Sequence, residues 1–265
     1  MPRFAANLTM MFTEWPFLDR FGVAADLGFT AVEFLFPYDH PREAIADRLN
    51  RHGLTLALFN FPPGDWAAGE RGLAALPGRE DELRAGVETA LRYAQSTGVS
   101  RLHLMAGLAD ATDPVARQTF RDNVAWTAAR LADANLDLLL EPINRRGMPG
   151  YFLNDFDEAA ALIADLDLPN LKLQFDFYHC QIIHGDVTTR LRVMLPMVGH
   201  VQIASVPSRQ EPGSEELNDG YLFAELDRLG YPGFVGCEYL PRAGTLEGLA
   251  WFAPYRASQR HLDRD

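Results

Sequence analysis

The segment Leu136-Asp137-Leu138-Leu139-Leu140-Glu141-Pro142 is a short apolar run that ends in a carboxylate and is closed by a proline. Such a run is typical of a strand that is buried on both faces, as in a parallel sheet. A second segment, Leu171-Lys172-Leu173-Gln174-Phe175-Asp176, also ends in a carboxylate. A stretch of helical period separates the two, so we interpret them as consecutive strands of βα units.

The same alternation of a short β-forming run and a longer helical stretch extends along the chain in both directions, and eight such units can be counted. The length of 265 residues fits one barrel without remainder, because (β/α)8 barrels commonly occupy about 250 residues. We therefore predict an α/β fold, a single (β/α)8 TIM barrel, with residues 1–265 as one domain. The predicted strands are Arg3–Leu8, Ala31–Phe36, Leu54–Asn60, Arg101–Met105, Leu136–Glu141, Leu171–Asp176, His200–Ala204 and Phe234–Glu238.

Helices of the outer layer are predicted where apolar residues recur at helical spacing. One such stretch follows the capping signal Asn154/Asp155. The apolar positions are Leu83, Val87, Leu91 and Ala94 in one helix, and Phe156, Ala159, Ala160 and Ile163 in the other.

Two connections are too long for a minimal βα turn. The first, Asn60 to Gly78, is rich in proline and glycine and contains Trp66; we interpret it as a lid or wall beside an active site. The second, Ser205 to Gly220, is mostly polar and follows the seventh predicted strand. The βα rhythm resumes after each, so neither is interpreted as an interdomain linker.

The composition of the chain limits the classes of function that it can have. The formal net charge is −12, with 36 acidic against 24 basic residues, which disfavours binding to a phosphate backbone. The two cysteines, Cys180 and Cys237, are too few for a disulfide framework. The first residues lack the apolar core of a secretory signal, and no run reaches the ~20 apolar residues of a membrane helix. We expect a cytoplasmic protein with a small-molecule partner, no nucleic acid and no membrane.

Polar residues terminate four consecutive predicted strands: Glu141, Asp176, Gln202 and Glu238. The active site of a barrel of this type lies at the carboxyl ends of its strands. Side chains alternate between the two faces of a strand, so if Glu238 points into the mouth, Cys237 faces the helices. We therefore expect these four side chains to lie close together.

Three carboxylates in one mouth would repel each other and raise one another's pKa values unless a cation neutralises them. Carboxylate oxygens from Glu141, Asp176 and Glu238 with the amide oxygen of Gln202 form a hard ligand set that suits Mg²⁺ or Mn²⁺ better than zinc. The alternative is that the polar strand ends face solvent and bind nothing. Their occurrence in four neighbouring units favours the metal.

Three further residues lie near these strand ends. His179 follows Asp176 in the run Asp176-Phe177-Tyr178-His179, and we assign it to the oxygens of a substrate. Arg209 lies in the second long connection and could pair bidentately with a carboxylate; a solvated loop arginine is the alternative. His103 fits a buried, hydrogen-bonded core histidine.

With these residues in place, the chain resembles the hydroxypyruvate isomerase family, which includes 2-oxo-tetronate isomerase, within the xylose isomerase-like TIM barrel superfamily. The resemblance covers nearly the whole chain. It is carried by Arg3-Phe-Ala-Ala-Asn-Leu-Thr-Met-Met-Phe12, Val32-Glu-Phe-Leu-Phe-Pro-Tyr38, Pro63-Gly-Asp-Trp-Ala-Ala-Gly-Glu-Arg-Gly72, Leu76-Pro-Gly-Arg-Glu80, Glu141-Pro-Ile-Asn144, His200-Val-Gln-Ile-Ala204 and Gly236-Cys-Glu-Tyr239.

The resemblance implies that Glu141 and Glu238 are the acid/base pair as well as metal ligands, and that Asp176 and Gln202 complete the coordination. Gln202 stands where related epimerases usually have a histidine ligand. The chain departs from the family pattern at Leu240, where a lysine is usual, and at Asn218-Asp219, where Asn-Tyr is expected. Both positions are expected near the substrate mouth, so the exact substrate stays open.

The expected reaction is the isomerisation of hydroxypyruvate to tartronate semialdehyde, or of 2-oxo-tetronate to 3-oxo-tetronate, through a cis-enediolate. A ketose 3-epimerase and a non-catalytic sugar-acid binding protein are the alternatives. A DNA-repair nuclease on the same barrel would need clustered zinc-binding histidines and a basic face, whereas the seven histidines here are scattered. These patterns do not decide the oligomeric state, and a homo-oligomer is compatible with them.

Overall fold

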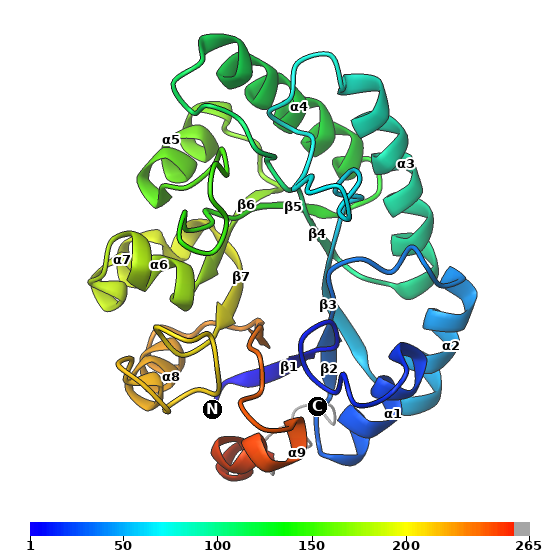
Figure 1. Ribbon diagram of the computed structural model, residues 1–265, viewed down its shortest axis with the longest axis vertical. Coiled ribbons are helices and arrows are strands. Elements are labelled where there is room, and N and C mark those ends of the chain that lie inside the picture. The colour runs from blue at the N-terminus through cyan, green and yellow to red at the C-terminus, as the bar shows by residue number, and fades with distance from the viewer. Residues whose placement is uncertain (257–265) are drawn as a thin grey trace.

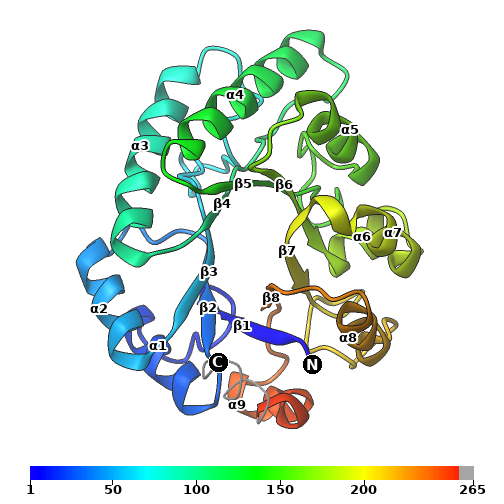
Figure 2. The ribbon, with the colours of Figure 1, turned by 180° about the vertical axis from the view of Figure 1, so that it is seen from behind.

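The computed structural model describes residues 1–256 and forms a closed barrel of eight parallel strands in sequential order. The strands form a central ring that helices surround on the outside, as two opposite views show (Figures 1 and 2). The α/β barrel predicted from sequence is therefore confirmed. The strands are β1 (Arg3–Asn7), β2 (Ala31–Glu33), β3 (Thr55–Asn60), β4 (Arg101–His103), β5 (Asp137–Leu140), β6 (Leu171–Asp176), β7 (Val198–Ile203) and β8 (Phe234–Cys237).

The helices follow their strands in the order expected of βα units, with two short helices instead of one after β6. They are α1 (Phe17–Asp26), α2 (Arg42–His52), α3 (Glu80–Thr97), α4 (Pro114–Ala132), α5 (Phe156–Leu166), α6 (Phe177–Ile183), α7 (Val187–Met194), α8 (Asp219–Arg228) and α9 (Thr245–Gly248), with 3₁₀ turns η1 (Leu195–Met197) and η2 (Leu249–Tyr255). No helix of the described residues is both long and apolar enough to cross a membrane.

Local chemistry explains where several helices begin and end. The Asp155 side chain accepts hydrogen bonds from the backbone amides of Asp157 and Glu158, which caps α5 at the predicted signal. Helices α2 and α3 end at Gly53 and Gly98, both in the left-handed conformation that glycine adopts without strain. The two predicted helices are thus α3 and α5.

The buried apolar side chains form two clusters. The main apolar core lies between the strands and the helices, and Cys237 is buried there as a free thiol. Inside the barrel, Ala5, Ala31 and Ala57 form a small cluster with Phe234. Buried polar side chains lie farther along the strands, since Asn7 and Glu33 come two residues after Ala5 and Ala31.

Candidate active site

All four predicted strand-end residues are buried in the mouth of the barrel. Asp176 is the last residue of β6 and pairs in register with Gln202 of β7. Glu141 and Glu238 each lie one residue beyond their strands, β5 and β8. Their exposed fractions are between 0% and 7%, so charged groups have been taken out of water here, which is costly unless they are compensated.

The Asp176 carboxylate uses its two oxygens differently. Oδ1 accepts a hydrogen bond of 2.7 Å from the backbone amide of Tyr178 and caps α6. Oδ2 is buried without a hydrogen-bond partner in the part of the chain that the structure describes, as is Oε1 of Glu141. Ligand atoms of Glu141, Asp176 and His179 all lie within 4.8 Å of one another. Unpaired buried carboxylate oxygens that face each other fit a divalent cation, which prefers oxygen ligands of this type.

Burial shifts the pKa values of the three carboxylates in the same direction. It raises the pKa of Glu141 well above its usual value, and the charges of Glu238 and Asp176 add to the effect. Burial likewise raises the pKa of Glu238 to about 8 and of Asp176 to about 6, although the Arg209 guanidinium opposes both shifts. A cation bound among them would reverse these shifts, because it stabilises the ionised forms.

His179 presents a proton donor to this cluster. Its Nδ1 accepts from the backbone amide of Asn144 at 3.2 Å, and the Asn144 side-chain amide lies 2.6 Å from the same atom. A backbone amide can only donate, so Nδ1 carries no proton and the neutral ring is protonated at Nε2. Burial lowers the pKa of His179 well below its usual value, which keeps the ring neutral. Nε2 lies 3.7 Å from Asp176 Oδ2 and 4.0 Å from Glu141 Oε1.

Arg209 reaches the same cluster from the connection after β7. Its guanidinium lies 3.2 Å from Glu238 Oε1 and 3.9 Å from Asp176 Oδ2, and 5.0 Å from the ring centre of Tyr178. The backbone holds Arg209 in a left-handed turn with φ of 56°, and its carbonyl accepts from the amide of Leu240. The structure therefore brings Arg209 and His179 to the three strand-end carboxylates.

Comparison with known proteins identifies the family. A family model described as xylose isomerase-like TIM barrel matches residues 21–255. The chain belongs to the xylose isomerase-like TIM barrel family. Its relatives include 2-oxo-tetronate isomerase of Cupriavidus necator, 55% identical over 96% of this chain and 99% of that protein. Hydroxypyruvate isomerase of Escherichia coli is 43% identical over 97% of this chain and 100% of that protein. The prediction of an isomerase of this family is thereby confirmed.

Solved structures agree with this family. One described as an AP endonuclease, family 2, from Brucella melitensis has 52% sequence identity and a TM-score of 0.95, and it covers 97% of this chain and 100% of that chain. The 3-keto-D-glucoside 4-epimerase of E. coli has 22% identity and a TM-score of 0.77, and it covers 95% and 100%. At that identity the second likeness shows the shared barrel alone.

The barrel of this family member also holds polar residues that were not predicted as site residues, among them His103, which was predicted to belong to the core. They line a cavity of about 10 Å³, close to the space that one water molecule needs. Each lies at or near the carboxyl end of a strand, so the strand-end rule applied to β1 through β4 would have found most of them. These polar residues are Asn7, Glu33, Asn60, His103 and Gln174.

His103 is buried as predicted, but the prediction that it is hydrogen-bonded was wrong. Within residues 1–256 neither ring nitrogen has a hydrogen-bond partner, and Nδ1 lies 3.7 Å from Glu141 Oε2. Burial lowers the pKa of His103 to about 3, so the ring is neutral. The sequence could not show this, because the contact depends on how β4 and β5 lie side by side.

The connection between β3 and α3 forms a wall at the same end of the barrel. Gly72 makes a β-bridge to Ala106, just after β4, and the Trp66 ring packs against Phe36 with ring centres 5.0 Å apart. The Arg71 guanidinium lies 3.9 Å from the centre of the Trp66 ring. These contacts place the predicted wall over the carboxyl ends of β2 to β4.

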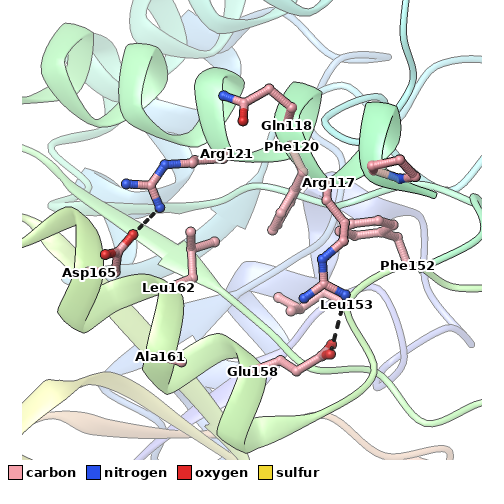
Figure 3. A pocket seen from close by; sticks show the side chains of 11 residues that line it. Arg117, Gln118, Phe120, Arg121, Phe152, Leu153, Glu158, Ala161, Leu162 and Asp165 are labelled. Carbon is pink, nitrogen blue, oxygen red and sulfur yellow. Dashed lines mark hydrogen bonds and ion pairs between the residues drawn. The ribbon is translucent and has the colours of Figure 1, made fainter. Parts of the chain in front are cut away.

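A larger hollow of about 470 Å³ lies outside the barrel, between α4 and α5. Figure 3 shows its apolar floor, which includes Phe120 and Phe152, and the ion pairs Arg117–Glu158 and Arg121–Asp165 that cross it. Its two arginines are already paired, and it contains none of the strand-end carboxylates. The candidate active site is therefore the smaller, polar cavity inside the barrel.

Proposed function

We propose that the chain is a divalent-metal-dependent isomerase of a short hydroxy-keto acid, acting on hydroxypyruvate or on 2-oxo-tetronate. The single observation that supports this most is the buried cluster of Glu141, Asp176 and His179, in which Glu141 Oε1 and Asp176 Oδ2 have no hydrogen-bond partner among residues 1–256. The names of relatives at 55% and 43% identity agree with it.

The residues that would hold Mg²⁺ or Mn²⁺ are Glu141, Asp176, Gln202 and Glu238, which all supply oxygen. When bound, the ion polarises the substrate carbonyl and acidifies the neighbouring C–H bond. One of Glu141 and Glu238 takes that proton and gives a cis-enediolate. A proton returned to the adjacent carbon, with transfer of the hydroxyl proton to the former carbonyl oxygen, completes the isomerisation.

Two further residues orient the substrate in this proposal. The Nε2–H of His179 donates to a substrate oxygen, in agreement with the tautomer that Asn144 imposes. Arg209 turns from Glu238 to the substrate carboxylate, which its guanidinium can bind through two parallel hydrogen bonds. A reducing cytoplasmic location fits the two free, buried cysteines.

A nuclease is a weaker candidate, although one similar structure carries that description. Each of the two possible metal-ligand groups among the described residues contains a single histidine, and the net charge is −12. A zinc nuclease that binds a phosphate backbone would instead have clustered histidine ligands and a basic surface. A ketose 3-epimerase is distinguished by its neutral substrates.

The test is a substrate panel of hydroxypyruvate, 2-oxo-tetronate, fructose and tagatose with Mn²⁺ or Mg²⁺, in wild type and Glu141→Gln. We expect isomerisation of a keto acid that is lost on chelation and restored by metal. We expect Glu141→Gln to fold normally and to lose more than about 10²-fold in kcat, because a proton-transfer group is removed. Turnover of the neutral ketoses alone would refute the assignment in favour of an epimerase.

A further inference from the structure

Glu33, the last residue of β2, is a buried carboxylate that the proposed reaction does not use. It is 1% exposed and reaches β7 through the barrel interior, past β1 and β8, which lie between β2 and β7 in the ring. Gly236 of β8 makes room for it: a Cβ atom there would overlap the Glu33 carboxylate oxygens. The absence of a side chain at 236 therefore permits the position of Glu33.

The Glu33 carboxylate is surrounded by hydrogen-bond donors. Oε1 accepts from Asn7 Nδ2 at 3.0 Å and from Gln202 Nε2 at 2.8 Å. Oε2 lies 2.7 Å from Nε2 of His200. One carboxylate on β2 thus links β1 and β7, and it contacts Gln202, one of the proposed metal ligands.

The direction of these hydrogen bonds can be derived from the backbone. The amides of Thr9 and Met10, which can only donate, point to Asn7 Oδ1 at 3.1 and 3.3 Å. The other end of the Asn7 side chain, Nδ2, therefore faces Glu33, and Glu33 Oε1 is an acceptor. Since Gln202 contacts the same oxygen, it must present its NH₂ group there.

The orientation of the Gln202 amide is thereby determined. With its NH₂ on Glu33, its oxygen points away from Glu33 and accepts from Gln174 Nε2 at 2.6 Å. Gln174 lies on β6, two residues before Asp176, which is the register partner of Gln202. The oxygen thus points to β6, the strand that ends at Asp176, and a second lone pair remains for a cation.

We infer that Glu33 is a positioning residue: it holds the amide of Gln202 with the oxygen, and not the NH₂ group, toward the divalent cation. The inference rests on the proposed metal-dependent function. Residues that orient metal ligands in this way typically change metal affinity 10- to 100-fold when replaced. The same effect is expected here without any loss of a ligand.

The test measures Mn²⁺ binding alone, by calorimetry and by the EPR spectrum of the bound ion. Glu33→Met removes the acceptor, and we expect Kd to rise about 10- to 100-fold with an altered spectrum. Glu33→Gln is the conservative variant: its oxygen can face Asn7 and Gln202 while its NH₂ faces His200. His200 can then accept at Nε2, because its Nδ1 has no partner among the described residues and can take the proton. We expect Kd and spectrum close to wild type.

Gly236→Ala tests the same inference with no polar group removed. The added methyl group meets the end of a flexible side chain, so Glu33 turns away and Mn²⁺ binding weakens as in Glu33→Met. Gly199→Ala is the control: its Cβ would meet Leu139 Cδ2 at 2.7 Å, near the start of β7, and we expect unchanged binding.

Wild-type affinity and spectrum in Glu33→Met would overturn the inference. If that variant does not fold, wild-type affinity in Gly236→Ala would overturn it. Equal Mn²⁺ binding by wild type and Glu141→Gln is a different result, because it contradicts the proposed metal site itself.

Discussion

At the scale of single residues, the site depends on atoms of one side chain having separate partners. Asp176 caps α6 with Oδ1 and leaves Oδ2 to the cluster. His179 accepts at Nδ1, so the neutral ring carries its proton at Nε2. Each side chain is therefore held in place by one atom while another is available for chemistry, which is the arrangement that a preorganised site requires.

The tautomer of His179 gives a prediction that separates its two nitrogens. In His179→Gln the amide nitrogen can reach the position of Nε2, whereas in His179→Asn it reaches only that of Nδ1. We expect His179→Asn to lose about 10²–10³-fold in kcat, because the donor to the substrate oxygen is removed, and His179→Gln to lose less. Steady-state kinetics would check this, with circular dichroism to confirm folding. A more active asparagine variant would contradict the assigned tautomer.

The role of Arg209 is tested by Arg209→Lys. A lysine keeps the charge near Glu238 but cannot form two parallel hydrogen bonds to a carboxylate. We expect KM for the keto acid to rise about tenfold or more, a loss of roughly 1.4 kcal/mol in binding, with a smaller change in kcat. The opposite pattern, a large fall in kcat at constant KM, would assign Arg209 to the chemical step.

At the scale of elements, the connections after β3, β4 and β5 are joined into one wall. Gly72 bridges to Ala106, and Leu108 bridges to Tyr151. The Tyr151 hydroxyl also accepts from the amide of Ala106 at 2.8 Å. Displacing one connection is therefore expected to disturb its neighbours.

Two glycines of the connection between β3 and α3 provide a matched pair of variants. Gly69 and Gly72 both have positive φ, 98° and 110°, but an added Cβ is unobstructed at Gly69 and would overlap the carbonyl of Met105 at Gly72. We expect Gly69→Ala to lower the free energy of unfolding by about 1 kcal/mol, from backbone strain alone. Gly72→Ala adds steric overlap and is expected to cost about 2–4 kcal/mol and to raise KM. Chemical denaturation measures both, and equal losses would show that the bridge to Ala106 carries no stability.

At the scale of the whole molecule, the buried carboxylates link stability to pH and metal. The pKa values of Asp176 and Glu238 are raised to about 6 and about 8 by burial, so these two groups hold more protons in the folded apoprotein than in the unfolded chain. Their contribution to stability is present at low pH and is lost as pH rises through these values. Bound metal removes that dependence, because it stabilises the ionised carboxylates.

We therefore expect the Tm of chelated protein to fall between about pH 5 and pH 8 relative to metal-loaded protein. Metal at about 100 times its Kd adds about 2.7 kcal/mol, or roughly 5–10 °C in Tm. Differential scanning calorimetry with and without Mn²⁺ across this range is the measurement, and Glu141→Gln is the control. A metal effect of equal size in that variant would place the ion elsewhere.

The order of strands and the position of the main carboxylates follow from sequence alone. Apolar runs such as Leu136–Glu141 indicate where a buried strand lies and which polar residue follows it. In a barrel the carboxyl ends of all strands lie at the same mouth, so these polar residues are expected there. The eight predicted strands are all present, with bounds that differ mostly at the carboxyl ends. There the chain leaves the sheet, as at Glu33, where β2 ends three residues before the predicted Phe36.

Only the tertiary structure decided which polar atoms meet. The contacts of His103 with Glu141, of Arg209 with Glu238, and of Glu33 with Gln202 join different strands or connections. Hydrogen bonds depend on distance and direction to within fractions of an ångström, and no pattern of residue types along the chain contains that information. The sequence determined the barrel and the residues at its mouth, whereas the fold determined which of their atoms are paired and which remain free for a cation and a substrate.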